Sequence, residues 1–537
     1  NLTLIAGYNY EAKYYRDLTA ANDGLLSEDL SDFNLAKGTT NFTLNGGRNE
    51  YAIMGWFYRA AYDYKGKYLA EVNGRYDGTS RFPRGKRYGF FPSFSAAYRI
   101  SEEAFFEPLR KTVDNLKIRL SYGSLGNQQI GYYDFIQTIT TKGSMGDYSF
   151  DGTILGQHAT VSDPVSGNQT WEKVISKNLG ADLNMFSNRL SLTADFYIRD
   201  TKGILGKGKS LPSIYGANEP QVNSNNLRTK GYELVLGWRD SFKLAGSTFS
   251  YGITGTFSDY TAEYTKCDNP SGLIGGPYVG KKYGEIWGYK VDGLFRNDEE
   301  AAEYASRVDL SKVAAGYYSA TGAYGKGVRG GDIKYLDLDG SGIVDGGKGT
   351  LEDPGDRRVI GNSSPRYQYG LTLNLSWYGF DLSVFMQGIG RLDWYPGADN
   401  LRFWGPYSRP YATFIPKNFM SQVWSESNSD AYLPRARAYT SLNSTQGTAY
   451  YTNDRYLQNL AYCRLKNLTL GYTIPKRLTS KVGIKECRVY FSGENLATWS
   501  ALKNDFLDPE QAAANSDKKS NVYPWCRTYS VGLNLTF

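Results

Sequence analysis

The last ten residues of the chain, 528–537, alternate polar and apolar side chains without interruption. Successive side chains of a β-strand point to opposite faces, so this pattern predicts a strand with one apolar and one polar face. About ten residues is also the length of a tilted strand that crosses a bilayer. The apolar positions are Tyr529, Val531, Leu533, Leu535 and Phe537.

The same alternation recurs in residues 190–198, 249–257 and 367–377. The polar positions of these segments are mostly small and uncharged, as Ser250 and Thr254 illustrate. A face in contact with bulk solvent would carry more Lys and Glu, so this composition favours the wall of a water-filled lumen. The whole chain is predicted to form fourteen membrane-length strands, near residues 1–16, 51–65, 67–80, 89–100, 114–126, 175–187, 189–202, 228–240, 247–263, 366–377, 380–391, 463–474, 488–499 and 527–537.

Long and tight connections alternate between these strands. Antiparallel strands that cross a membrane place alternate connections on opposite sides, and outer-membrane barrels keep one side tight. The pattern therefore predicts an all-β transmembrane antiparallel β-barrel, with Phe537 at the periplasmic rim and the long links outside the cell. These extracellular links lie near residues 17–50, 127–174, 203–227, 264–365, 392–462 and 500–526.

Composition supports a barrel without requiring one. The chain contains 46 Tyr and 60 Gly residues, and aromatic residues make up 15% of it. No run of about 18 apolar residues occurs, which excludes transmembrane helices. Barrels escape that test because each strand is only half apolar, and their aromatic girdles enrich Tyr and Trp. On composition alone, a large soluble all-β protein stays an alternative.

Candidate chemistry is sparse. The single histidine, His158, lies in a polar connection, which argues against most acid–base and metal-dependent hydrolytic catalysis. The four cysteines have no short metal-ligand spacing, and the net charge of +7 is not gathered into a basic run. We therefore expect neither an enzyme nor a nucleic-acid-binding protein.

The chain starts at Asn1 inside a strand pattern and shows no signal peptide. We therefore expect an N-terminal portion of a longer polypeptide to be missing. Because fourteen is an even number, the strands could close alone as a passive diffusion channel. Otherwise the missing portion supplies further strands, since unpaired edges are not tolerated in lipid.

Eight blocks of sequence carry a resemblance to a known family, at residues 74–106, 116–135, 331–345, 364–390, 456–478, 493–500, 508–511 and 523–537. Together they resemble the SusC/RagA family of TonB-dependent outer-membrane transporters. The resemblance implies a 22-stranded barrel, of which this chain holds the last fourteen strands. It also implies an N-terminal plug and a TonB-binding segment, which this sequence lacks.

The resemblance also implies partners. A SusD-like surface lipoprotein would close as a lid over the mouth, and TonB would act through the missing N-terminal part. The substrate would be an oligosaccharide or, as in some members, a peptide. Outer-membrane lipid and lipopolysaccharide would surround the barrel, and a dimer of such two-protein units is compatible with the resemblance. The alternatives are the passive fourteen-stranded channel and a soluble carbohydrate-binding β protein.

A calcium site is predicted in residues 337–345. Calcium prefers several hard oxygens on a tightly turned loop, and Gly342 occupies the sixth position, where an EF-hand-like loop turns. Lys348 stands where the usual Glu would be, so Glu352, Asp353 or Asp356 would supply a late carboxylate. The alternative is a plain Asp/Gly-rich turn. The expected ligands are Asp337, Asp339, Ser341, Ile343 through its backbone carbonyl, and Asp345.

Three further segments have candidate roles. In an expected extracellular link, Phe403, Trp404, Tyr407 and Tyr411 could line the substrate route, since aromatic rings can stack on sugars; otherwise they pack the loop. Residues 297–307 resemble a short capped helix, which serves a partner lid or steadies its loop. A basic cluster could bind lipopolysaccharide phosphates, latch the plug or form a solvated turn. It consists of Arg81, Arg84, Lys86 and Arg87.

Overall fold

The structure of the chain is a computed structural model. The residues that it describes are 1–25, 27, 29, 31–38, 42–142, 149–150, 153–154, 158–209, 211–318, 327–398, 400–409, 411, 413, 415–437, 447–504, 506–513 and 525–537.

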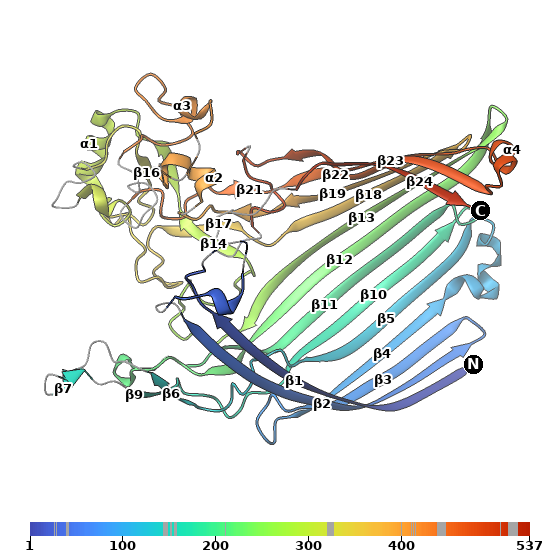
Figure 1. Ribbon diagram of the computed structural model, residues 1–537, viewed down its shortest axis with the longest axis horizontal. Coiled ribbons are helices and arrows are strands. Elements are labelled where there is room, and N and C mark those ends of the chain that lie inside the picture. The colour runs from blue at the N-terminus through green and yellow to red at the C-terminus, as the bar shows by residue number, and fades with distance from the viewer. Residues whose placement is uncertain are drawn as a thin grey trace. The chain divides into compact units, whose positions relative to one another are not determined.

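One long antiparallel sheet dominates the described residues (Figure 1). It contains fourteen strands, and each is hydrogen-bonded to the next long strand along the chain, which confirms the predicted strands and their order. The strands are β1 Leu2–Ala21, β2 Thr43–Tyr64, β3 Tyr68–Thr79, β4 Tyr88–Arg99, β5 Val113–Asn127, β10 Glu172–Met185, β11 Leu190–Lys207, β12 Gln221–Leu244, β13 Ser247–Lys266, β18 Arg366–Trp377, β19 Phe380–Arg391, β22 Tyr462–Thr473, β23 Glu486–Ser500 and β24 Thr528–Thr536.

The connections hold shorter elements. The short strands are β6 Ile139–Lys142, β7 Ser149–Phe150, β8 Thr153–Ile154, β9 His158–Val161, β14 Glu285–Tyr289, β15 Val291–Leu294, β16 Ile333–Tyr335, β17 Arg357–Asn362, β20 Asp393–Trp394 and β21 Gln458–Asn459. The α-helices are α1 Asp298–Arg307, α2 Leu401–Trp404, α3 Phe419–Gln422 and α4 Lys476–Thr479. Short 3-10 helices lie at Phe33–Leu35, Ile100–Glu102, Ala104–Leu109, Ser213–Tyr215, Ala315–Tyr318, Gly405–Tyr407 and Ser480–Val482. Among the described residues, no helix has the length and apolar character needed to cross a membrane.

The strand register separates apolar from polar side chains over six neighbouring strands, β13 to β24. One row across these strands is apolar, and the row displaced by one residue on each strand is polar or Gly. Because neighbouring positions on a strand face opposite sides, the two rows lie on opposite faces of the sheet. The apolar row is Tyr251, Leu375, Leu382, Leu470, Phe491 and Val531. The polar row is Gly252, Asn374, Ser383, Thr469, Ser492 and Ser530.

The tight connections are two-residue turns where the sequence provides a suitable pair. Tyr378 and Gly379 join β18 to β19 with φ values of 50° and 83°. Ala245 and Gly246 join β12 to β13 with φ values of 47° and 85°. Two successive positive φ values match the twist of an antiparallel hairpin, and Gly adopts them at little cost. A Cβ atom on Gly379 would also lie 2.7 Å from the carbonyl oxygen of Thr473.

Two predicted links are shorter in the structure than the sequence suggested. The link expected at 17–50 is reduced because the β1–β2 ladder continues through charged residues, pairing Arg16 with Arg48 and Ala21 with Thr43. The link expected at 203–227 is reduced because β11 and β12 extend to Lys207 and from Gln221. Polar residues interrupt the alternation from which the strand ends were predicted. Backbone hydrogen bonds between strands do not require this alternation, so the strands continue beyond it.

The chain divides into two compact units. The first comprises residues 1–98, 119–178 and 199–227, and the second comprises 99–118, 179–198 and 228–537. In the first unit, Phe82, Phe91 and Trp171 form a small buried cluster. The indole nitrogen of Trp171 donates a hydrogen bond to the Arg87 carbonyl at 2.9 Å, which ties the turn after β3 to the start of β10.

In the second unit, the described residues of the long links around 264–365 and 392–462, together with those of 501–513, fold into one body with its own hydrophobic core. We call it the loop body. Figure 1 shows α1, α2, α3 and β16 gathered at one end of β18, β19 and β22, with α4 at their other end. Fully buried side chains from the two longest links meet there, including Phe295, Tyr335, Trp404 and Tyr456.

The helix expected at 297–307 is confirmed as α1. Asn297 caps it by accepting a 2.9 Å hydrogen bond from the backbone N–H of Glu300. The Glu300 carboxylate reaches back to the backbone N–H of Arg296 at 2.7 Å. Two side chains of the helix, Ala301 and Tyr304, are buried in the loop body. The Tyr304 hydroxyl donates a hydrogen bond to the Tyr335 carbonyl. The helix therefore stabilises the loop body.

The two faces of the sheet predict opposite responses to one substitution. Leu373 lies on the apolar face between Ile253 and Val384, and its neighbour Thr372 lies on the polar face. Leu373→Arg should destabilise the protein by about 2–4 kcal/mol if the residue lies near the bilayer midplane. Thr372→Arg should cost much less. Equilibrium unfolding in lipid vesicles, followed by tryptophan fluorescence, would measure both, and equal losses would contradict the assignment of the faces.

Candidate functional site

Three carboxylates meet at the loop for which calcium was predicted. Among the described residues, Asp337, Asp339 and Asp356 form a group whose ligand oxygens all lie within 4.8 Å of one another. Calcium binds oxygen at about 2.3–2.6 Å, so oxygens on opposite sides of one ion lie up to about 5 Å apart. The separation therefore fits a single calcium ion. Asp337 and Asp339 were predicted ligands, and Asp356 was one of three candidates for the late carboxylate.

Backbone N–H groups hold the three side chains in place. The Asp337 carboxylate accepts hydrogen bonds from Gly340 at 2.8 Å and Gly342 at 2.9 Å, both of which have positive φ. Asp356 is fully buried and accepts from Leu338 at 2.6 Å and Asp345 at 2.9 Å. Burial raises the pKa of the Asp356 carboxyl, whereas hydrogen bonds from Ser341 lower that of Asp339. Each of the three carboxylates retains at least one lone pair that could bind a metal, on Oδ2 in the case of Asp356, whose Oδ1 accepts from both Leu338 and Asp339.

The remaining predicted ligands form other contacts. The Ser341 hydroxyl donates to the Ile343 carbonyl at 3.0 Å, so these two oxygens are hydrogen-bonded to each other. The Asp345 carboxylate accepts from the backbone N–H of Gly347 at 2.7 Å. The arrangement thus suits a calcium ion bound mainly by Asp337, Asp339 and Asp356, and calcium binding stays a prediction.

Most of the predicted substrate-binding aromatics lie inside the loop body. Phe403, Trp404 and Tyr407 are at most 5% exposed. The Tyr407 hydroxyl donates to the Pro434 carbonyl at 2.7 Å, and burial raises its pKa far above the usual value. Tyr411 alone presents an exposed ring, at 75%. Buried rings offer no face to a sugar, so the three buried residues pack the loop body in this structure. The substrate role of all four stays a prediction.

The basic cluster divides into two kinds of side chain. The Arg81 guanidinium lies 4.3 Å from the ring centre of Tyr51 and 4.9 Å from that of Tyr132. Arg87 donates to the Phe82 carbonyl at 3.0 Å. Arg84 and Lys86 are exposed. The first two therefore stabilise the turn, and only the exposed pair is accessible to an external anion such as a lipid phosphate.

One buried ion pair joins two long links of the loop body. Arg437 binds Asp332 through two of its nitrogens, and the two side chains are 7% and 0% exposed. The guanidinium also stacks over Tyr317, 3.9 Å from the ring centre. Burial raises the pKa of Asp332 to about 6, although the nearby Arg437 acts to lower it. Sequence reasoning missed this pair because nothing local connects residues 105 positions apart.

A second ion-pair network fastens the last link to the sheet. Arg464 on β22 is 3% exposed and contacts Asp508 and Glu510, each at 2.7 Å. Lys466 also contacts Glu510 at 2.7 Å. Residues 508–511 form one of the blocks of family resemblance, which was the only sequence signal for them. Their carboxylates hold the link after β23 against the polar face.

Comparison with known proteins agrees with this fold. The family model described as TonB dependent receptor-like, beta-barrel, matches residues 1–496. The chain belongs to this family. Its members are outer-membrane β-barrels, so the protein is a component of the bacterial outer membrane. The soluble carbohydrate-binding alternative is therefore wrong.

Curated relatives carry related names. TonB-dependent receptor P3 of Formosa agariphila is 27% identical over 560 residues, covering all of this chain and 50% of the relative. TonB-dependent receptor SusC of Bacteroides thetaiotaomicron is 25% identical over 499 residues, covering 90% of this chain and 44% of the relative. The chain thus spans about half the length of the curated relatives that it matches.

Solved structures show the same fold. The RagAB peptide importer in its open-open state superposes with a TM-score of 0.73 at 22% identity. The alignment covers all of this chain and 52% of that chain. The expected similarity to the SusC/RagA group is thereby confirmed at the level of fold.

Calcium binding would appear as added stability. At a calcium concentration 100-fold above its dissociation constant, a site present only in the folded state stabilises the protein by about 2.7 kcal/mol. Thermal unfolding of the full-length protein, with calcium or with a chelator, would measure this gain. Asp337→Asn should remove most of it, whereas Glu352→Gln, an exposed residue outside the three carboxylates, should retain it. An unchanged transition in the wild-type protein would exclude the site.

The network around Arg464 predicts a local effect. Arg464→Met leaves Asp508 without its partner, and breaking a buried ion pair in this way costs about 3–5 kcal/mol. Residues 501–513 should then be cleaved faster in limited proteolysis, with the sites identified by mass spectrometry. Lys503→Gln, an exposed residue of the same link, is the matched control. Equal cleavage of both variants would mean that the network does not hold the link.

Proposed function

We propose that this chain is the barrel portion of a transporter that imports nutrient oligomers across the outer membrane, using energy delivered by TonB. The observation that carries this proposal is the family match over residues 1–496. The family name describes receptors that depend on TonB, and RagAB, which shares the fold, is named a peptide importer.

The sheet is suited to this task. Its polar row consists of Gly, Ser, Thr and Asn side chains, which solvate a polar solute without trapping it by charge. The Thr469 and Ser492 hydroxyls lie 3.2 Å apart and exchange a hydrogen bond along this row. The opposite row of large apolar side chains would face lipid. No covalent chemistry is required, so the proposed protein is not an enzyme.

The proposed partners follow from the same relationship. A SusD-like surface lipoprotein would cover the end of the sheet that carries the loop body. The folded core of that body offers a rigid support for a lid, because α1 and the buried aromatic residues hold its links together. TonB would act through a segment outside this chain. The substrate would be an oligosaccharide or a peptide.

Growth and uptake measurements test the proposal. A strain without the gene should lose growth on at least one purified oligosaccharide or peptide mixture, and the gene should restore it. Loss of TonB should abolish uptake of the same compound. Uptake that continues without TonB would instead indicate passive diffusion and would overturn the proposal. Co-purification of a surface lipoprotein with the tagged transporter would test the lid.

A further inference from the structure

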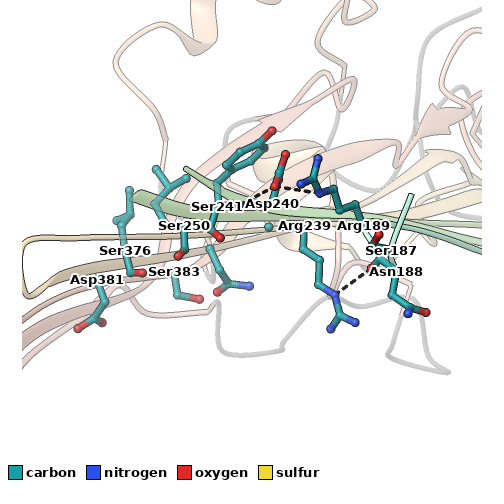
Figure 2. A pocket seen from close by; sticks show the side chains of 15 residues that line it. Ser187, Asn188, Arg189, Arg239, Asp240, Ser241, Ser250, Ser376, Asp381 and Ser383 are labelled. Atoms are coloured by element: carbon teal, nitrogen blue, oxygen red, sulfur yellow. Dashed lines mark hydrogen bonds and ion pairs between the residues drawn. The ribbon is translucent and has the colours of Figure 1, made fainter. Parts of the chain in front are cut away.

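The two faces of the sheet can be told apart on β12 (Figure 2). Its neighbouring residues Arg239 and Asp240 point to opposite sides, and Arg239 shares its side with Ser383 of the polar row. Asp240 therefore points to the apolar side, where it pairs with Arg189 at 3.2 Å. Because side chains alternate along a strand, the other even-numbered positions of β12 lie on this side as well. The apolar side would face lipid, so a plug inside the barrel would not cover it.

A row of aromatic rings crosses this apolar side. The ring centre of Tyr232 lies 6.4 Å from that of Phe196 and 6.0 Å from that of Phe257. The rings of Phe257 and Tyr367 are stacked, with their centres 6.5 Å apart. We call these four residues the outer belt. Aromatic side chains of membrane barrels gather at the two membrane interfaces, so the outer belt indicates where the bilayer ends.

The spacing to a second aromatic group supports this placement. Phe242 and Phe249, beside the tight turn between β12 and β13, have ring centres 5.3 Å apart. Ten positions separate Phe242 from Tyr232 on β12, and eight separate Phe249 from Phe257 on β13. At about 3.4 Å per residue and a tilt of about 40°, these steps span roughly 21–26 Å across the membrane, close to the apolar band of about 25 Å in such barrels. With the long links outside the cell, the outer belt lies in the outer leaflet.

Charged residues gather just beyond the outer belt. Lys230 lies two positions from Tyr232 on the same face of β12, and its side chain is exposed. Glu263 lies six positions beyond Phe257, on the same face of β13, and pairs with Lys282. The backbone of Lys282 is also bridged to that of Glu263, which fixes the pair against the strand.

The cations outnumber the carboxylate at this point. The Glu263 carboxylate accepts a hydrogen bond from the Lys282 ammonium group and also interacts electrostatically with Lys230 and Arg228. Lys230 makes no hydrogen bond and no close ion pair with any residue that the structure describes. Lys282 already occupies the carboxylate, so the positive charge of Lys230 is in excess.

A second charged pair beside the outer belt is balanced. Arg366 donates to Asp259 through Nε at 2.6 Å and lies 5.1 Å from the centre of the Tyr367 ring. Asp259 is only 5% exposed, so this pair is closed to an external ion. The excess charge is therefore localised at Lys230.

We propose that Lys230, with Lys282 beside it, binds a phosphate group of lipid A, the membrane anchor of lipopolysaccharide. An ammonium group binds phosphate as a point charge. The outer belt below Lys230 supplies an apolar surface for the acyl chains, while the cation lies at the height of the headgroup. Free phosphate would match the cation but would leave this apolar surface unused.

The position of the cluster selects this ligand. An anion that reaches an exposed lysine directly beyond a lipid-facing belt must itself lie at the membrane boundary. Lipid A carries phosphate groups at that height in the outer leaflet, and their charge complements the excess cation. The inference concerns only the lipid-facing side, so it depends neither on the substrate that crosses the barrel nor on TonB.

Native mass spectrometry of the full-length transporter, purified in detergent and titrated with bis-phosphorylated lipid A, tests the site. Lys230→Glu should weaken binding of the first lipid A molecule at least tenfold, because it reverses the charge that faces the phosphate. Lys243→Glu is the matched control, since it makes the same change at an exposed residue on the opposite face of the same strand. This control should leave the affinity unchanged. Resistance of each variant to unfolding in cold SDS would confirm that it is folded.

Two comparison lipids test the chemistry and its source. Lipid A without its phosphates should bind the wild-type protein at least tenfold more weakly, and Lys230→Glu should then cause no further loss. Phosphatidylglycerol, which carries one phosphodiester, should bind at least threefold more weakly than lipid A. Unchanged lipid A affinity in Lys230→Glu, or equal binding of the dephosphorylated lipid, would overturn the site. Phosphatidylglycerol binding as tight as that of lipid A would overturn the choice of ligand and indicate a glycerophospholipid headgroup instead.

Discussion

Every other feature of this protein depends on the pairing of backbone N–H and C=O groups between neighbouring strands. Inside a bilayer no water can satisfy these groups, so a spanning segment must find its partners within the protein. The sheet meets this demand in the simplest order, with each long strand beside the next. That order allows short reversals on one side, and the turns at Ala245–Gly246 and Tyr378–Gly379 provide two of them through positive φ values. Once pairing is set, the period of two assigns each side chain to lipid or to water.

The long links must satisfy a different constraint. A link of about a hundred residues outside the sheet loses much conformational entropy when it folds. This loss must be offset by the burial of apolar side chains. The loop body achieves the burial with large aromatic side chains, such as Trp404 and Tyr456, rather than with regular secondary structure. Ion pairs then select one arrangement of the links. The Asp332–Arg437 pair adds little net stability, because removing both charges from water costs about as much as their attraction returns.

Features with a periodic sequence pattern could be predicted from the sequence, whereas contacts between distant residues could not. Alternation predicted all fourteen strands, because a two-faced strand leaves a local pattern. It misjudged the ends of β1 and β2, where pairing continues through Arg16 and Arg48 after the pattern stops. In the Asp-rich loop, spacing identified Asp337 and Asp339, whereas three acids were equal candidates for the last carboxylate, and only the folded loop selects Asp356. Likewise, no local signal distinguishes a ring that lines a route from one that packs a core, which is why Trp404 was ambiguous.

Charge on the polar face follows a rule that only the structure reveals. Long cationic side chains there reach across small residues to a carboxylate, as Arg488 does over Gly471 to Asp381, and Arg464 does toward Asp508. Each pair cancels its own field, so the wall stays polar but nearly neutral.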